Sequence, residues 1–414
     1  MKKIAILVFF TVGFFVHVWA CTGLIAGKQA TVDGSVLVTY SADSHTLYGA
    51  LTSSPAADWP KGSMRSIVEW DTNKPLGEIE QVEHTYAVIG NMNEHQLTVV
   101  ESTWGGRPEL VDTTGIIDYG SLMQLALERA KTAREAIKVM TGLVKKYGYY
   151  SSGESFTIAD PNEAWILDLI GKGPGRRGAV WVAVRIPDDC IAGHANYPRI
   201  HKIPMDDKEN CLYSPDVISF AREMGYFDGL NKDFSFARAY SPADFGALRA
   251  CDARVWSFFR KYDSSMDNYL PYVNGESAEP FPLYVKPSRK LSVQDMKEAM
   301  RDHFEDTPFD MTQDVGAGPF KVPYRFRPMS FEVDGKSYCM ERAIATQQTG
   351  FTLVGQMRNW LPDPVGGVLW FGVDDANTCV YIPMYCGITQ VPECFSPENG
   401  SMYDFSWTSA FWIH

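Results

Sequence analysis

Strand-turn-strand patterns and helical patterns occupy separate blocks in the first half of the chain, and this order constrains the fold more than any other feature. Apolar stretches flank Asp33-Gly34 and, later, the turn at 161–162, as in β-hairpins. Between them, an apolar-periodic segment over 116–148 begins behind Asp118, a residue suited to cap a helix. Hairpins and helices in separate blocks predict an α+β fold in which helices cover antiparallel sheets, rather than a doubly wound parallel sheet.

The first hairpin begins abruptly with a cysteine. A loop over about 30–34 would pair Cys21 with Asp43 on the returning strand. A free α-amine has a pKa of about 8, close to that of a thiol, so an amino-terminal cysteine can supply both nucleophile and base. The amine takes the thiol proton and later returns it to the leaving nitrogen, while a carboxylate orients the ammonium. We therefore expect Cys21 and Asp43 to be catalytic once the preceding residues are removed.

The residues before Cys21 have the layout of a secretory signal peptide. Two lysines precede an apolar run over 4–16, and the small residue Ala20 ends the segment. The run is shorter than the ~20 residues of a membrane-spanning helix, and no later run is long and apolar enough. We expect residues 1–20 to be removed and residues 21–414 to be exported, to the periplasm or the extracellular space, as a single domain.

Lipidation is the competing interpretation of this cysteine. Val18-Trp19-Ala20-Cys21 carries the cysteine and the preceding small residue of a bacterial lipoprotein site. Bulky Trp19 fits that site poorly, whereas Val18 and Ala20 suit ordinary signal peptidase. Lipidation would link the sulfur to lipid and acylate the amine, which would make the chain an outer-membrane lipoprotein without the proposed catalyst.

Composition excludes several classes of function. Hydrophobic residues make up 45% of the 414 residues and aromatic residues 13%, as in a globular protein with a sizeable core. The formal charge of −12 argues against nucleic acid or an anionic membrane as a partner. The eight cysteines form no zinc-ligand pattern and the glycines no phosphate-binding loop, so we expect no metal and no cofactor. Cys379, Cys386 and Cys394 are close enough for a disulfide, with buried free cysteine as the equal alternative.

Two asparagines lie in loops that could complete a site. Asn93 follows an apolar strand, and Asn196 follows the apolar strand over 180–186. As an oxyanion donor Asn196 would be worth ~3 kcal/mol of barrier, although asparagine is also an ordinary turn residue. His194 is better explained as a hydrogen-bonded or solvent-facing side chain than as a general base. No serine stands in a G-x-S-x-G elbow, so a serine hydrolase has little support.

Several stretches of the chain, in this order, resemble the N-terminal-nucleophile cysteine dipeptidase family that includes dipeptidase A and the secernins. They cover almost all of the sequence after residue 20. The stretches are 21–43, 90–95, 154–160, 180–196, 253–259, 346–350 and 360–367.

The resemblance implies the four-layer αββα sandwich of N-terminal-nucleophile hydrolases and the release of amino acids from dipeptides. Cys21 would be the nucleophile, with its free amine as base. By analogy with bile-salt and penicillin amidases, Asp43 would orient the amine, Asn196 would stabilise the oxyanion and Arg254 would supply the later arginine of the site. Asn93 would contribute through its backbone or side chain. A helical pattern around Arg254 predicts, alternatively, an ordinary surface or salt-bridged arginine.

Substrate contacts are expected from Glu101 and Tyr40. A carboxylate such as Glu101 or Asp43 would bind the ammonium of a small peptide and limit its length. Tyr40 stands where many family members have an arginine three residues before the aspartate, so any thiolate stabilisation by that arginine must be absent or come from elsewhere. Family chains also usually continue past the aromatic segment 405–414, which predicts a chain shortened at its carboxyl end. Homo-oligomers are compatible with this fold.

Two further functional hypotheses remain open on the sequence. An N-acyl amidohydrolase of the bile-salt or penicillin amidase kind would use the same scaffold with an apolar acyl group and without a free substrate amine. A lipid-anchored or inactive binding protein would carry lipid on Cys21 or lack an assembled site. Blocking the substrate amine separates the first two functions, and Cys21→Ser separates both from the third.

Overall fold

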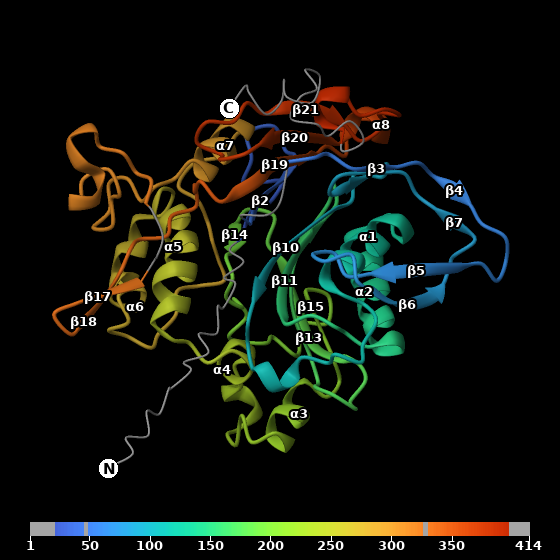
Figure 1. The fold of residues 1–414 in the computed structure, drawn as a ribbon, viewed down its shortest axis with the longest axis horizontal. Helices are drawn as coiled ribbons and strands as arrows, with labels where there is room; N and C mark the ends of the chain where they lie inside the picture. Colours follow the sequence, from blue (N-terminus) through green and yellow to red (C-terminus); the bar gives the residue numbers. More distant parts are fainter. Residues whose placement is uncertain (1–20, 45–48, 326–329, 397–414) are drawn as a thin grey trace, which may run out of the picture.

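The computed structural model describes residues 21–44, 49–325 and 330–396. The predicted signal peptide and the segment 405–414 lie outside these residues. The described residues form two large antiparallel sheets together with helices (Figure 1). The predicted α+β fold is therefore confirmed.

The first sheet contains the strand that begins directly after Cys21. In order across the sheet, its strands are β16 (Tyr284–Val285), β14 (Ile191–His194), β1 (Thr22–Ala26), β2 (Val36–Asp43), β19 (Thr349–Met357), β20 (Val368–Val373) and β21 (Ile382–Tyr385). Gly23 of β1 pairs with Tyr40 of β2, a register shifted by one residue from the predicted pairing of Cys21 with Asp43. The shift arises because the connection over 27–35 folds into its own turns rather than a tight hairpin loop. A one-residue shift matters because neighbouring side chains point to opposite faces of a strand.

The second sheet carries Glu101. In order, its strands are β15 (Cys211–Tyr213), β13 (Ala179–Ile186), β12 (Ala164–Gly171), β11 (Gly153–Ala159), β10 (Thr98–Trp104), β9 (Met92–Asn93), β8 (Val88–Ile89) and β3 (Ser53–Ser54). Strands β11 and β12 pair on either side of the turn at 161–162, so this predicted hairpin is confirmed.

Helices cover one face of each sheet (Figure 1). The helices are α1 (Tyr119–Arg129), α2 (Ala133–Tyr147), α3 (Val217–Glu223), α4 (Phe236–Tyr240), α5 (Ala253–Arg260), α6 (Leu270–Val273), α7 (Val293–Met300) and α8 (Asp363–Gly366). Helices α1 and α2 pack on the second sheet, and α5 and α7 pack on the first. The two sheets contact each other through their other faces, so Leu24 lies in the core beneath α5 and α7 while its neighbour Ile25 lies in the core between the sheets. Asp118 caps α1 as predicted, since it accepts a hydrogen bond from the backbone N–H of Ser121 at 3.1 Å.

A separate hairpin, β5 (Met64–Val68) and β6 (Pro75–Glu80), lies against α1. Its buried residues Ile67 and Ile79 belong to the same apolar core as Leu122 of that helix. This contact fixes the hairpin on the helix although it is not part of either large sheet. Two other short pairs are β4 (Ala57–Asp58) with β7 (His84–Thr85), and β17 (Ser330–Val333) with β18 (Lys336–Cys339).

The described residues lack a membrane-spanning helix, a metal-binding cluster and disulfides among the three closely spaced cysteines. None of their helices is long and apolar enough to cross a membrane. They hold no cluster of three or more His, Cys, Asp or Glu side chains arranged to bind a metal ion. Cys379, Cys386 and Cys394 are each unpaired, so the free-cysteine alternative holds for these three residues.

Candidate active site

Cys21 opens into a cavity of about 200 Å³ where the two sheets and α1 meet. The residue is only 4% exposed, so the cavity is the environment of its thiol. The predicted residues Tyr40, Asp43 and Glu101 line the same cavity. Other parts of the wall come from Trp70, Asp71, Gly90, Asn91, Tyr119, Met123, Phe351 and Phe371.

Tyr40 connects the thiol of Cys21 to Glu101. Its hydroxyl lies 3.6 Å from Cys21 Sγ and donates a hydrogen bond to Glu101 Oε1. Cys21 lies two residues from Gly23, the cross-strand partner of Tyr40, so both side chains are on the same face of the first sheet. A neutral phenol thus occupies the place beside the sulfur where the family resemblance implied an arginine.

The acidic, buried setting keeps the Cys21 thiol protonated. Burial raises the pKa of Cys21 well above its ordinary value, and the charges of Glu101 and Asp43 raise it further. Hydrogen bonds from the Asp43 backbone N–H and the Tyr40 hydroxyl oppose this shift only in part. Burial likewise raises the pKa of Tyr40, with Cys21 and Glu101 adding to it. A thiolate therefore requires a base or a positive charge close to the sulfur.

The carboxylate of Asp43 is fixed by groups from later parts of the chain. It forms an ion pair with Arg342, accepts a hydrogen bond from Thr349 Oγ1 at 2.7 Å and accepts another from Ser41 Oγ at 3.2 Å. The Asp43 side chain is fully buried. The charge of its carboxylate raises the pKa of the Cys21 thiol, whereas its backbone N–H lowers it.

Arg254 holds the backbone of Cys21 from behind the cavity. It lies on α5, as the helical pattern predicted, but it is 1% exposed rather than on the surface. Its Nη1 donates to the Cys21 carbonyl oxygen at 2.8 Å and to Thr22 Oγ1 at 2.7 Å. Its Nη2 donates to the Ala195 carbonyl at 3.1 Å and to Asn196 Oδ1 at 2.7 Å. Burial, with the nearby Arg342 guanidinium, lowers its pKa to about 10, so Arg254 stays charged at neutral pH.

Asn196 links Arg254 to the second sheet. Its Nδ2 donates to the Thr103 carbonyl at 2.6 Å while its Oδ1 accepts from Arg254. Its backbone has a left-handed φ of 59°, which asparagine tolerates better than most residues. The side chain lies behind Cys21, and Asn196 is not among the residues that line the cavity.

His194 is hydrogen-bonded inside the protein, the interpretation favoured by the sequence. Its Nδ1 lies 2.6 Å from Ser102 Oγ and its Nε2 lies 2.9 Å from Thr157 Oγ1. Burial, together with Arg254 and Arg199, lowers its pKa to about 3. His194 is therefore a neutral side chain that joins the two sheets.

Asn93 is not brought to Cys21. Its Nδ2 donates to the carbonyls of Leu127 and Ala130 at 2.8 and 2.7 Å, and its Oδ1 accepts from the backbone of His95 and Leu97. These bonds satisfy carbonyls at the carboxyl end of α1 and fold the loop after β8 onto that helix. All these hydrogen bonds of the Asn93 side chain are made within the protein, and the nearby cavity wall is formed by Gly90 and Asn91 instead.

Two carboxyl residues in or near the cavity wall had not been proposed from the sequence. Asp71 lies at the mouth of the cavity, where its Oδ1 accepts a hydrogen bond from the Tyr119 hydroxyl at 2.8 Å. Glu154 lies deeper, where its Oε1 accepts from Thr103 Oγ1 at 2.8 Å. Burial, followed by neighbouring Glu101, raises the pKa of Glu154 well above its ordinary value. Cross-strand pairing of Thr103 with Glu154 is the signal that could have found this residue, whereas no sequence pattern marks Asp71.

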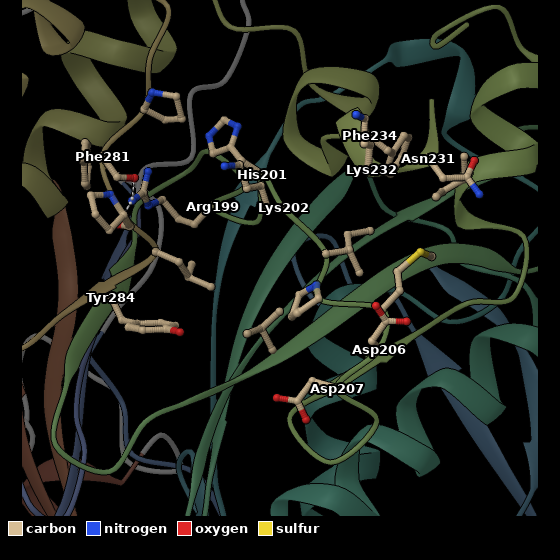
Figure 2. Close-up of a pocket in the computed structure, with 18 of the residues that line it drawn as sticks. Arg199, His201, Lys202, Asp206, Asp207, Asn231, Lys232, Phe234, Phe281 and Tyr284 are labelled. Atoms are coloured by element: carbon tan, nitrogen blue, oxygen red, sulfur yellow. Dashed lines mark hydrogen bonds between the residues drawn. The ribbon is translucent and has the colours of Figure 1, made fainter. Parts of the chain in front are cut away.

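A larger cavity, about 1030 Å³, lies away from Cys21 (Figure 2). Arg199 is turned toward Phe281 in it, donates to the Phe281 carbonyl at 3.4 Å and pairs with Asp252 at 3.1 Å. Burial lowers the pKa of His201 to about 3 with help from Arg199 and Arg238, so its imidazole is neutral. No cysteine belongs to the described lining. The buried charge of Arg199 is neutralised by Asp252. The Cys21 cavity, although smaller, is therefore the candidate active site.

Comparison with known proteins shows the family of the chain. The model of peptidase family C69 matches residues 20–414. A probable dipeptidase of Salmonella dublin is 27% identical over 396 residues, covering 89% of this chain and 81% of the relative. A probable dipeptidase of Latilactobacillus sakei is 25% identical, covering 95% and 79%. Dipeptidase A of Lactobacillus helveticus is 24% identical, covering 95% and 80%. The resemblance found in the sequence is confirmed, and the chain belongs to peptidase family C69.

Proposed function

We propose that this peptidase is an exported cysteine dipeptidase in which Cys21, made amino-terminal by removal of residues 1–20, is the nucleophile. The observation that carries the proposal is the position of the Cys21 thiol, at the start of β1 and inside a cavity lined by carboxylates. Relatives that match most of the chain are named as dipeptidases, which supports the substrate class.

The base in this proposal is the α-amine of Cys21 itself. The neutral amine accepts the thiol proton, and the sulfur attacks the peptide carbonyl carbon. The ammonium then gives this proton to the leaving nitrogen as the amide bond breaks, and water hydrolyses the thioester. Because the pKa of the buried Cys21 thiol is raised, the scheme also requires the adjacent ammonium to stabilise the thiolate as it forms.

Arg254 and Asn196 act as positioning residues in this scheme. Arg254 fixes the carbonyl of Cys21 and Asn196 fixes Arg254 against the second sheet. Both therefore control where the sulfur and the amine point, which is a proximity effect. Asp43, anchored by Arg342 and Thr349, supports the Cys21 end of the cavity through its backbone N–H and its charge.

Glu101 binds the substrate ammonium in this scheme. It lies 2% exposed in the cavity wall beside Glu154, and no N–H or hydroxyl of the described residues donates to its Oε2. A buried carboxylate with a second carboxyl group as its neighbour is costly unless a ligand supplies positive charge. The Tyr40 hydroxyl orients the carboxylate of Glu101 by donating a hydrogen bond to Oε1. An ammonium held this close to the nucleophile limits the amino-terminal side of the substrate to one residue.

Replacement of Glu101 by glutamine should weaken selection for a free substrate amine. We expect the ratio of kcat/KM for a dipeptide to that for its N-acetylated form to fall about 30-fold, the size of one charge-assisted hydrogen bond. Steady-state hydrolysis of the two peptides measures the ratio. Glu83→Gln, an exposed carboxylate outside the cavity, should leave the ratio as in wild type. Faster cleavage of the N-acetylated peptide by the wild type would instead favour the N-acyl amidohydrolase.

The proposed fold is the four-layer αββα sandwich of N-terminal-nucleophile hydrolases, formed by residues 21–414 as one domain. Two antiparallel sheets in contact, each with helices on its outer face, support this assignment. A nucleophile at the start of a central strand supports it as well. Export is supported by the sequence pattern of residues 1–20.

A further inference from the structure

The turn between β5 and β6 is fastened to the beginning of α1, and it carries Asp71 to the mouth of the Cys21 cavity. The backbone N–H of Trp70 donates to Asp118 Oδ2 at 2.8 Å, and the Tyr119 hydroxyl donates to Asp71 Oδ1 at 2.8 Å. A Cβ at Gly120 would lie 2.5 Å from the Trp70 side chain, so glycine is needed for this close approach. Two hydrogen bonds and a tight contact thus hold Asp71 in place.

The cavity presents two carboxylates at different depths. Glu101 is buried beside Glu154, and no N–H or hydroxyl of the described residues donates to its Oε2, whereas Asp71 is exposed at the mouth. The described lining contains no lysine or arginine, and the carboxylate of Asp43 is already paired with Arg342. One ammonium satisfies Glu101, which leaves Asp71 to receive a second positive charge.

We propose that Asp71 selects dipeptides whose amino-terminal residue has a cationic side chain, lysine or arginine. This inference rests on the proposed function, in which Glu101 holds the α-ammonium. The side-chain cation then reaches Asp71, and Trp70 in the same wall covers the aliphatic stem. The α-ammonium of the amino-terminal residue therefore pairs with Glu101, and the cation of its side chain pairs with Asp71.

The preference for a cationic side chain should depend on pH. Although Asp71 is exposed as a residue, desolvation of its carboxyl group by the surrounding protein raises its pKa to about 6, with the Tyr119 hydroxyl on α1 lowering it and Asp118, Glu101 and Glu69 raising it. Above this pKa the carboxylate is charged and attracts the cation, and below it the neutral acid does not. The preference should accordingly rise as the pH increases through about 6.

The test compares Lys-Ala with norleucine-Ala, which has almost the same shape without the side-chain charge. For the purified wild-type protein at pH 8, we expect kcat/KM to be about tenfold higher for Lys-Ala, a smaller effect than at buried Glu101 because Asp71 is exposed. Asp71→Asn should bring the ratio to about one at all pH values, and Asp71→Glu should restore most of it. Glu78→Gln removes the same charge from the exposed face of the same hairpin and should keep the wild-type ratio.

The outcomes distinguish failure of the proposed role of Asp71 from failure of the proposed dipeptidase function. Equal cleavage of Lys-Ala and norleucine-Ala by the wild type, or an unchanged ratio in Asp71→Asn, overturns the role of Asp71 while the dipeptidase proposal stands. A ratio in the wild type that does not change between pH 5 and 8 also overturns it. Failure of the wild type to cleave either peptide overturns the proposed function, and this inference with it.

Discussion

Replacement of Cys21 by alanine should lower kcat/KM for a dipeptide by at least about 10³-fold, because Cys21 is the only cysteine in the described lining of the cavity and its thiol carries the covalent step. The side chain is small and buried, so alanine removes one atom beyond Cβ and should leave the fold intact. Hydrolysis rates measured alongside the thermal unfolding midpoint distinguish loss of chemistry from loss of structure.

A matched variant shows whether the effect belongs to this cysteine. Cys394→Ala removes a partly buried cysteine that does not line the cavity, and it should retain the wild-type rate. Cys21→Ala with more than a tenth of the wild-type activity would exclude the thiol as nucleophile, and with it the mechanism.

Arg254→Met should lower the free energy of unfolding by about 3–5 kcal/mol, because it leaves several buried acceptors without a donor. Those acceptors are the carbonyls of Cys21 and Ala195, with Thr22 Oγ1 and Asn196 Oδ1 beside them. Activity should fall as well, even in conditions where the variant is folded, since the Cys21 backbone loses its anchor. Denaturant unfolding and kcat/KM measured on the same preparation give both quantities.

Two comparisons sharpen the test of Arg254. Arg254→Lys keeps the charge but lacks the planar fork, so its stability and activity should lie between those of wild type and Arg254→Met. Arg260→Met, on the same helix, removes a partly exposed ion pair with Asp267 and should cost no more than about 1 kcal/mol. Wild-type stability and activity in Arg254→Met would contradict the anchoring role.

The arrangement of the backbone could be predicted further than the placement of side chains. Apolar spacing and caps such as Asp118 identified hairpins and helices, because these signals are local. The register of the first hairpin was missed by one residue because the turns over 27–35 depend on contacts that reach Leu291 in another segment. The alternative of Arg254 as an ordinary surface arginine was wrong, because α5 packs with every residue from Ala253 to Phe259 buried.

Residues of the site were predictable where they lie on the predicted strands. Cys21, Tyr40 and Glu101 belong to such strands and meet at the cavity. Asn93 looked functional because its loop is rich in glycine and asparagine, yet its amide is used to satisfy the end of α1. Asp71 was missed because its position depends on how a separate hairpin docks on that helix, which no local pattern encodes.

The most direct test of the central claim is mass spectrometry of the amino-terminal tryptic peptide of the protein purified from its native export route. The account predicts a peptide over residues 21–28 with an unmodified amine and thiol on Cys21. A peptide that retains residues from 1–20, or one that carries diacylglyceryl on Cys21, would contradict it, because in neither case is the amine–thiol pair available.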